Sequence, residues 1–268
     1  MPTRHVQPHP LSPLDNARGK PSPLTERGNS DRRRPSRSEV KRSPRDARRG
    51  AIPDRVRRGI PRALLRWYDR HGRDLPWRRV SDPYHFLVAE YMLQQTQVSR
   101  VVDYYDRFLL RYPTVERLAR ARAQTVRESW EGLGYYARAR NLHSAAQMIV
   151  REHGGRVPDT EPALRRLPGV GRYTANALLS IAHAQDCGTV DANIARVFSR
   201  LFAVKPPLKT AAAQRRLWSI AEALAPRGRA GDFNQALMDL GATVCVPRRP
   251  RCPECPVRRW CALGNRSG

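Results

Sequence analysis

Residues 245–261 read CVPRRPRCPECPVRRWC, a run that places four cysteines in the spacing C-x6-C-x2-C-x5-C. Four thiolates this close in sequence can hold a [4Fe–4S] cluster or a zinc ion with four sulfur ligands. Two disulfides are the structural alternative, but nothing else in the chain is typical of a secreted protein. The expected ligands are Cys245, Cys252, Cys255 and Cys261.

The net charge of the chain indicates which kind of partner such a loop binds. The 268 residues carry a formal net charge of +26, and five arginines lie between the four cysteines. This excess is too large for an ordinary metabolic enzyme and predicts a polyanionic partner, in the first place DNA. With no long apolar run and no N-terminal signal, we expect no membrane partner and a cytoplasmic, nucleoid-associated protein, whose reducing compartment keeps the thiols reduced. Cys187 stands apart and is predicted to be a small buried residue.

The chain divides by composition. Residues 1–55 are rich in Pro, Arg and Ser without apolar periodicity, which predicts a disordered basic arm or a start codon assigned too early. From Ile60 onward, apolar residues recur with helical spacing, as in IPRALLRWYDRHG, and no segment shows a convincing strand alternation. An all-α protein of roughly ten helices follows.

Residues 167–175, LPGVGRYTA, place two glycines just before a helix. A tight hairpin at a helix N-terminus can present backbone N–H groups to a DNA phosphate, although a plain turn between helices also uses glycine. The flanking residues favour a helix-hairpin-helix motif, with phosphate bound at Gly169, Val170 and Gly171.

Two acids fit the chemistry of glycosidic cleavage. Glu90 lies in the apolar stretch FLVAEYMLQQTQV, and Asp191 precedes the helix of DANIARVFSRLF. A carboxyl with a raised pKa and an ionised carboxylate can act as acid and electrostatic stabiliser. A satisfied core acid and a helix N-cap are the structural alternatives.

Six separated motifs recur in the order of a known family: LPWR (75–78), EYMLQQTQV (90–98), GLGYYARARNLH (132–143), LPGVGRYTA, VDANIARV (190–197) and FNQALMDLGATVC (233–245). The chain resembles the helix-hairpin-helix, [4Fe–4S] DNA glycosylases, and within them the MutY adenine glycosylases. The resemblance implies a two-lobed, all-α monomer that binds mismatched or damaged double-stranded DNA between its lobes. One lobe is a six-helix bundle, residues 81–187, and the other joins residues 56–80 to the cluster-bearing residues 188–268.

The resemblance also implies the role of each site residue. Glu90 would protonate the flipped adenine, and Asp191, with Asn193, would stabilise the cationic sugar. Tyr173 stands where bifunctional relatives carry a Schiff-base lysine, and no lysine occurs between residues 42 and 204, so a monofunctional enzyme is expected. Adenine contacts would come from Arg78 and Gln235, and wedges into the base stack from Gln95 and Tyr135. Spacing alone leaves open a solvated Gln95, a core Tyr135, and an Arg78 paired with Asp74 or Asp82.

The chain departs from the family pattern where it ends. MutY proteins continue into a Nudix-like domain that helps to read 8-oxoguanine, and this sequence stops shortly after Cys261. Short relatives that remove thymine or uracil opposite guanine share the tyrosine and a similar VDAN segment, so they remain the alternative to an adenine enzyme. Two further alternatives come from other classes of protein. The presence of both Glu90 and Asp191 argues against a non-catalytic damage sensor. The hairpin and the basic arm argue against an iron–sulfur redox protein.

Overall fold

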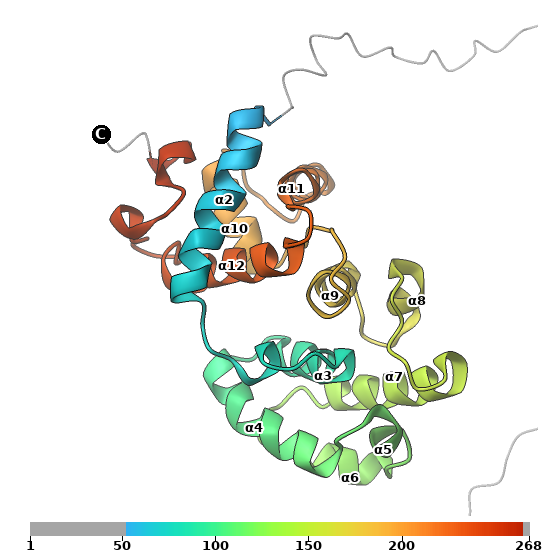
Figure 1. Ribbon diagram of the computed structural model, residues 1–268. Helices are drawn as coiled ribbons and strands as arrows, with labels where there is room; N and C mark the ends of the chain where they lie inside the picture. Colours follow the sequence, from blue (N-terminus) through green and yellow to red (C-terminus); the bar gives the residue numbers. More distant parts are fainter. Residues whose placement is uncertain (1–51, 265–268) are drawn as a thin grey trace, which may run out of the picture. The chain divides into compact units, whose positions relative to one another are not determined.

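A computed structural model describes residues 52–264, and every regular element in this range is helical, which confirms the all-α prediction (Figure 1). The elements are, in order, α2 (Asp54–His71), η1 (Pro76–Arg78), α3 (Pro83–Leu93), α4 (Val98–Arg111), α5 (Val115–Ala119), α6 (Ala123–Glu128), α7 (Ala137–His153), α8 (Glu161–Arg166), α9 (Arg172–Ala177), η2 (Leu178–Ala182), α10 (Ala192–Leu201), α11 (Ala211–Leu224), α12 (Ala230–Thr243), η3 (Cys252–Glu254) and η4 (Arg258–Trp260). None of these helices is both long and apolar enough to span a lipid bilayer.

Two separate hydrophobic cores organise these helices. The first is built from buried residues between Leu75 and Leu179, with α3 and α7 at its centre. The second core joins α2 to α10, α11 and α12 (Figure 1). Helix α2 contacts α11 and α12, although it lies more than a hundred residues earlier in the chain. The chain therefore leaves the second core after α2, builds the first core, and returns near Val190.

Two boundaries differ from the sequence-based expectation. Leu75 and Trp77 pack in the first core, although residues 56–80 were predicted to belong to the other lobe; Trp77 lies edge-on to Tyr105 with ring centroids 5.4 Å apart. Helix α2 begins at Asp54 rather than Ile60 and contains Pro61. Pro61 is buried with Ile60, Leu64 and Leu65, and this packing stabilises the helix around it. Most of the predicted basic arm, residues 1–51, lies outside the described residues.

Local sequence explains where α10 begins. The Asp191 side chain accepts a hydrogen bond from the backbone N–H of Ile194 at 2.6 Å, which satisfies one of the free donors of the first turn. The apolar residues Ile194, Val197, Phe198 and Leu201 follow at helical spacing and are buried in the second core. The first core continues in a single helical segment from α9 into η2, one turn of π-helix. Helix packing thus fixes the positions of Asp191 and of Tyr173.

Candidate active site

A small cavity brings together four predicted site residues, each from a different element of the fold. Glu90 comes from α3, Arg78 from η1, Tyr173 from α9 and Gln235 from α12. Apolar side chains complete the wall, together with Arg73: Leu75, Trp77, Phe86, Leu93, Val98, Ile181 and Met238. The structure therefore brings together four residues that the sequence assigned to one site and that lie up to 157 positions apart (78 to 235).

Glu90 is the buried acid of this cavity. Its side chain is 3% exposed, and burial raises the pKa of the carboxyl to about 8. The Tyr173 hydroxyl donates to Glu90 Oε1 at 3.5 Å, which lowers the pKa somewhat, and the charge of Asp191 raises it further. At neutral pH Glu90 therefore holds a proton that it can give to a bound base.

Asp191 is the better stabilised of the two carboxylates. Burial raises the pKa of Asp191 above its ordinary value, and the N–H of Ile194, the side-chain amide of Asn193 at 3.0 Å and the charge of Arg196 counteract part of this rise. Glu90 has only the long contact from Tyr173 in compensation. When the two acids compete for one negative charge, Asp191 ionises and Glu90 keeps the proton.

Hydrogen bonds continue from Asp191 toward the first cysteine of the 245–261 loop. Asn193 bonds Asp191 with its amide nitrogen and accepts from Arg196 Nη2 at 2.8 Å with its oxygen. Arg196 also donates to the backbone oxygens of Gly241 at 2.7 Å and Cys245 at 2.9 Å. The predicted role of Asn193 thus has a direct geometric basis, because it links the carboxylate to the arginine.

Arg78 does not pair with either of the acids that spacing suggested. Asp74 bonds Arg79, and Asp82 accepts from the N–H of Tyr84 at the start of α3. The guanidinium of Arg78 instead bonds the fully buried Asp239 through Nη1 at 2.8 Å and Nη2 at 3.0 Å. Arg73 adds two more hydrogen bonds to the same carboxylate, from its N–H at 2.9 Å and Nε at 2.7 Å.

Asp239 is a buried partner of the cavity wall that the sequence reasoning missed. It lies four positions after Gln235, on the same face of α12, and orients one wall of the cavity through Arg78. An acid inside an apolar helix was available as a signal, and it is the signal that identified Glu90.

Gln235 has an unused hydrogen-bonding group in the cavity. Its side chain is 8% exposed, and Oε1 is buried without a hydrogen-bond partner. A buried polar atom without a partner is costly, and a bound group that donates a hydrogen bond would remove this cost.

The two predicted wedge residues are exposed and share an uncommon backbone. Gln95 has φ of 58° and Tyr135 has φ of 51°, both in the left-handed region that non-glycine residues rarely occupy. The Tyr135 side chain is 62% exposed, so it is not the core aromatic that spacing alone permitted. Strained, exposed residues of this kind concentrate at functional sites.

The hairpin at residues 167–171 forms the turn that the sequence predicted between α8 and α9. Gly169 has φ of 81°, and a Cβ on it would meet Asn141 at 2.9 Å, so this position needs glycine. The N–H of Val170 donates to the carbonyl of Leu167 at 3.1 Å and is thus used within the turn. Phosphate binding at Gly169, Val170 and Gly171 stays a prediction.

The four cysteines of the 245–261 loop line a second cavity. Within residues 52–264 no three His, Cys, Asp or Glu side chains are placed to hold a single metal ion. Two donors point at the sulfurs: Arg200 Nη1 lies 3.3 Å from Cys245 Sγ, and the N–H of Gly264 lies 3.3 Å from Cys261 Sγ. Four thiols with N–H donors around apolar walls suit a cluster of several metal ions. The lining residues include Val244, Cys245, Pro250, Cys252, Cys255, Cys261 and Leu263.

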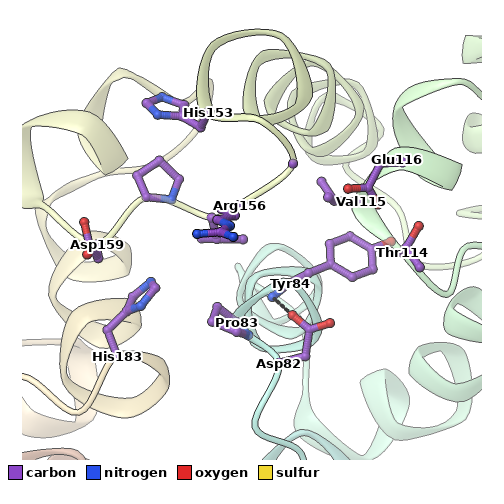
Figure 2. Close-up of a pocket in the computed structure, with 13 residues that line it drawn as sticks. Asp82, Pro83, Tyr84, Thr114, Val115, Glu116, His153, Arg156, Asp159 and His183 are labelled. Carbon is purple, nitrogen blue, oxygen red and sulfur yellow. Dashed lines mark hydrogen bonds between the residues drawn. The ribbon is translucent and has the colours of Figure 1, made fainter.

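A further hollow lies away from these residues. Figure 2 shows it between the starts of α3 and α5 and the segment after α7, and it mixes acidic with basic side chains. Its lining contains none of the predicted site residues, so it is distinct from the cavity around Glu90. The side chains with a charge or an imidazole ring are Asp82, Glu116, His153, Arg156, Asp159 and His183.

Comparisons with known proteins agree with this geometry. The family model "HhH-GPD superfamily base excision DNA repair protein" matches residues 88–223. The adenine DNA glycosylase of Rattus norvegicus is 48% identical over 216 residues, which cover 77% of this chain. A solved thermostable thymine-DNA glycosylase superposes with a TM-score of 0.73 at 32% identity and covers 80% of this chain and 98% of its own.

A second solved structure, an endonuclease III–DNA covalent intermediate, shares the fold, with a TM-score of 0.68 at 22% identity. The match covers 81% of this chain and 99% of that chain. The chain spans only 42% of the length of the rat relative. The family model nevertheless matches half of the chain and includes Glu90, Tyr173 and Asp191. The chain belongs to the HhH-GPD superfamily of base excision DNA repair proteins.

Proposed function

We propose that this chain is a monofunctional adenine DNA glycosylase that hydrolyses the N-glycosidic bond of adenine mispaired with 8-oxoguanine or guanine. The observation that carries the proposal is the burial of Glu90, which raises the pKa of its carboxyl to about 8, in a cavity that also contains the unpartnered Oε1 of Gln235. Relatives from rat, human and mouse that are 46–48% identical are named adenine DNA glycosylases. The partner is double-stranded DNA bound by a monomer.

The first step is departure of the base. Adenine leaves the helix and enters the cavity, where Glu90 donates its proton to the ring and turns adenine into a better leaving group. Gln235 accepts from the exocyclic amino group, and Arg78, held by Asp239, fixes one wall. The wedges Gln95 and Tyr135 fill the space left in the base stack and offset part of the unstacking cost.

The second step concerns the sugar. As the bond to adenine breaks, positive charge develops on the sugar, and the ionised Asp191 stabilises it. Asn193 and Ile194 hold this carboxylate in place through hydrogen bonds. Tyr173 cannot form an imine, so water completes the hydrolysis and leaves an abasic site without strand cleavage.

A single-turnover excision assay on four duplexes tests the proposal: adenine opposite 8-oxoguanine, adenine opposite guanine, thymine opposite guanine and uracil opposite guanine. We expect cleavage at adenine that appears only after alkali, because the enzyme makes an abasic site and does not cut the strand. Strand cleavage without alkali, or borohydride trapping of a covalent complex, would contradict the monofunctional assignment.

A mismatch glycosylase for thymine or uracil is the second candidate. The solved thymine-DNA glycosylase matches this chain over 98% of its own length, at 32% identity and a TM-score of 0.73. Cleavage at thymine or uracil in the same assay would favour this candidate and make Gln235 a reader of pyrimidines. No cleavage on any duplex, with tight binding retained, would favour a damage sensor.

We further propose that Cys245, Cys252, Cys255 and Cys261 hold a [4Fe–4S] cluster. Arg196 and Arg200 of α10 already bond residues 245 and 246 of this loop. A cluster held by the four cysteines would therefore fasten the rest of the loop next to α10. Purified protein is expected to be brown, with absorbance at roughly 400 nm and several iron atoms per chain in metal analysis. A colourless protein with one zinc ion per chain would exclude the cluster.

A further inference from the structure

Arg138 stands out among the buried residues that the proposed mechanism does not use. It lies in the first turn of α7, and its side chain is 5% exposed. Burial lowers the pKa of its guanidinium, yet an arginine side chain stays charged in proteins. A buried charge of this kind is retained only where surrounding groups compensate it.

The compensation comes from the end of α3 with the loop that follows it, and from the loop before α7, rather than from an acid. Nη1 lies 2.6 Å from the carbonyl oxygen of Met92, 2.5 Å from that of Gln94 and 2.9 Å from Oγ1 of Thr96. Nη2 lies 3.0 Å from the carbonyl oxygen of Gly134 and 3.3 Å from that of Leu133. In the part of the chain that the structure describes, no carboxylate forms an ion pair with Arg138. One fork of the guanidinium therefore serves residues 92–96 and the other serves residues 133–134.

These two loops carry the two wedge residues. Gln95 lies between two of the groups that Nη1 contacts, Gln94 and Thr96, and Tyr135 directly follows Gly134. Both wedge residues have left-handed backbone conformations, which persist only where the surroundings fix them. The guanidinium also lies 5.4 Å from the centre of the Tyr135 ring, so it faces the ring as well as the loop.

Further contacts tie the same loops to each other and to the hairpin. Arg100 donates to the carbonyl of Gly132, and Gln94 Nε2 donates to the carbonyl of Gly169 at 3.4 Å. Arg100 is exposed and Gln94 is half-buried, whereas Arg138 is buried. Arg138 is thus the internal connection between the two wedges.

We propose that Arg138 is a positioning residue that clamps the loops 92–96 and 133–135 into one rigid unit, so that Gln95 and Tyr135 enter the base stack together. This inference rests on the proposed function, because it needs a base that leaves the helix. It adds a residue that touches neither base nor sugar but sets how readily the target base is extruded.

Arg138→Lys tests the clamp with its charge retained. A single ammonium group keeps a hydrogen-bonding cation in the core but cannot reproduce the fork that serves both loops. We expect the single-turnover excision rate to fall about tenfold or more, because extrusion of the base has to offset the cost of unstacking. When 2-aminopurine replaces the target adenine, the increase in its fluorescence on extrusion should fall by a matching factor. Arg151→Lys, on an exposed part of the same helix, is the matched control and should change neither readout.

A double-mutant cycle separates positioning from a general structural role. In a protein that already carries Gln95→Ala and Tyr135→Ala, Arg138→Lys should cause no further loss, because the residues through which it acts are absent. An equal fold-loss in both backgrounds would overturn the proposal. Thermal unfolding of each variant establishes that it is folded at the assay temperature.

Hydrogen exchange of the free protein decides the clamp without DNA. In Arg138→Lys the backbone amides of residues 93–97 and 133–136 should exchange faster together, while the amides of α12 stay unchanged. Faster exchange in one loop alone, or in neither, would overturn the clamp. If the wild-type protein excises no adenine, the proposed function fails, whereas this exchange result still decides whether Arg138 holds both loops.

Discussion

Replacing Glu90 by glutamine is expected to lower the single-turnover excision rate by about 10²–10⁴-fold, which is the usual contribution of a general acid. Glutamine has nearly the same shape and still accepts from Tyr173, so DNA binding should persist, but it has no proton to give to adenine. In the wild-type protein the rate should fall as the pH rises through about 8, where Glu90 ionises. This alkaline limb should vanish in the residual activity of the variant.

The same substitution should stabilise the fold at neutral pH. Burial raises the pKa of Glu90 from 4.5 to about 8, so between these values the folded protein holds a proton that the unfolded chain has released. The free energy of unfolding of the wild type therefore decreases as the pH rises through this window, by an amount on the order of a few kcal/mol. Glutamine does not titrate, so the variant should unfold at a higher temperature than the wild type at pH 8 and show a smaller difference at pH 5.

Glu222→Gln provides the control for both measurements, because Glu222 is an exposed glutamate on α11. It should alter neither the excision rate nor the unfolding temperature. Full activity of Glu90→Gln would remove Glu90 from the mechanism. Lost activity without a gain in stability at pH 8 would mean that Glu90 is ionised in the folded protein and acts as a charge rather than as an acid.

Residues within one short motif could be predicted from sequence. The helical periodicity, the four cysteine positions and the glycine turn before α9 depend on neighbours within a few positions, and the sequence contains all of them. The pairing of Glu90 with Tyr173 needed the family resemblance, because their contact joins residues 83 positions apart. Nothing in the local pattern of either segment indicates that contact.

The positions that sequence reasoning missed are those whose partners are carbonyl groups or distant in the chain. Arg138 bonds main-chain oxygens of two loops, and a backbone oxygen leaves no trace in the residue types. Arg78 had acids four positions to either side, Asp74 and Asp82, yet it bonds Asp239, which is 161 positions away. Proximity in sequence favoured the wrong partners because exposed neighbours compete weakly with a buried carboxylate.

Asp239→Asn is expected to give the largest loss of stability, about 3–5 kcal/mol of the free energy of unfolding. The carboxylate is fully buried and accepts four hydrogen bonds from Arg73 and Arg78, so the amide would leave two arginines without their counter-charge. The excision rate should also fall, because Arg78 would lose the partner that holds it against the cavity. Urea unfolding and the single-turnover assay measure the two effects.

The pH dependence of this loss distinguishes an ion pair from a packing defect. Burial by itself raises the pKa of Asp239, but the hydrogen bonds and charges of Arg78 and Arg73 outweigh burial and leave the pKa below its ordinary value. The stabilisation by Asp239 is therefore present above the pKa of the unfolded chain, near 3.8, and is lost as the pH falls through the lower pKa of the folded state. The difference in the free energy of unfolding between wild type and Asp239→Asn should accordingly become smaller in acid.

Asp74→Asn breaks the exposed pair with Arg79 and should change the free energy of unfolding little at any pH. If the two variants lose equal stability, the buried carboxylate does not hold the arginines of the cavity wall, and Arg78 must be positioned by the packing of η1 against the first core.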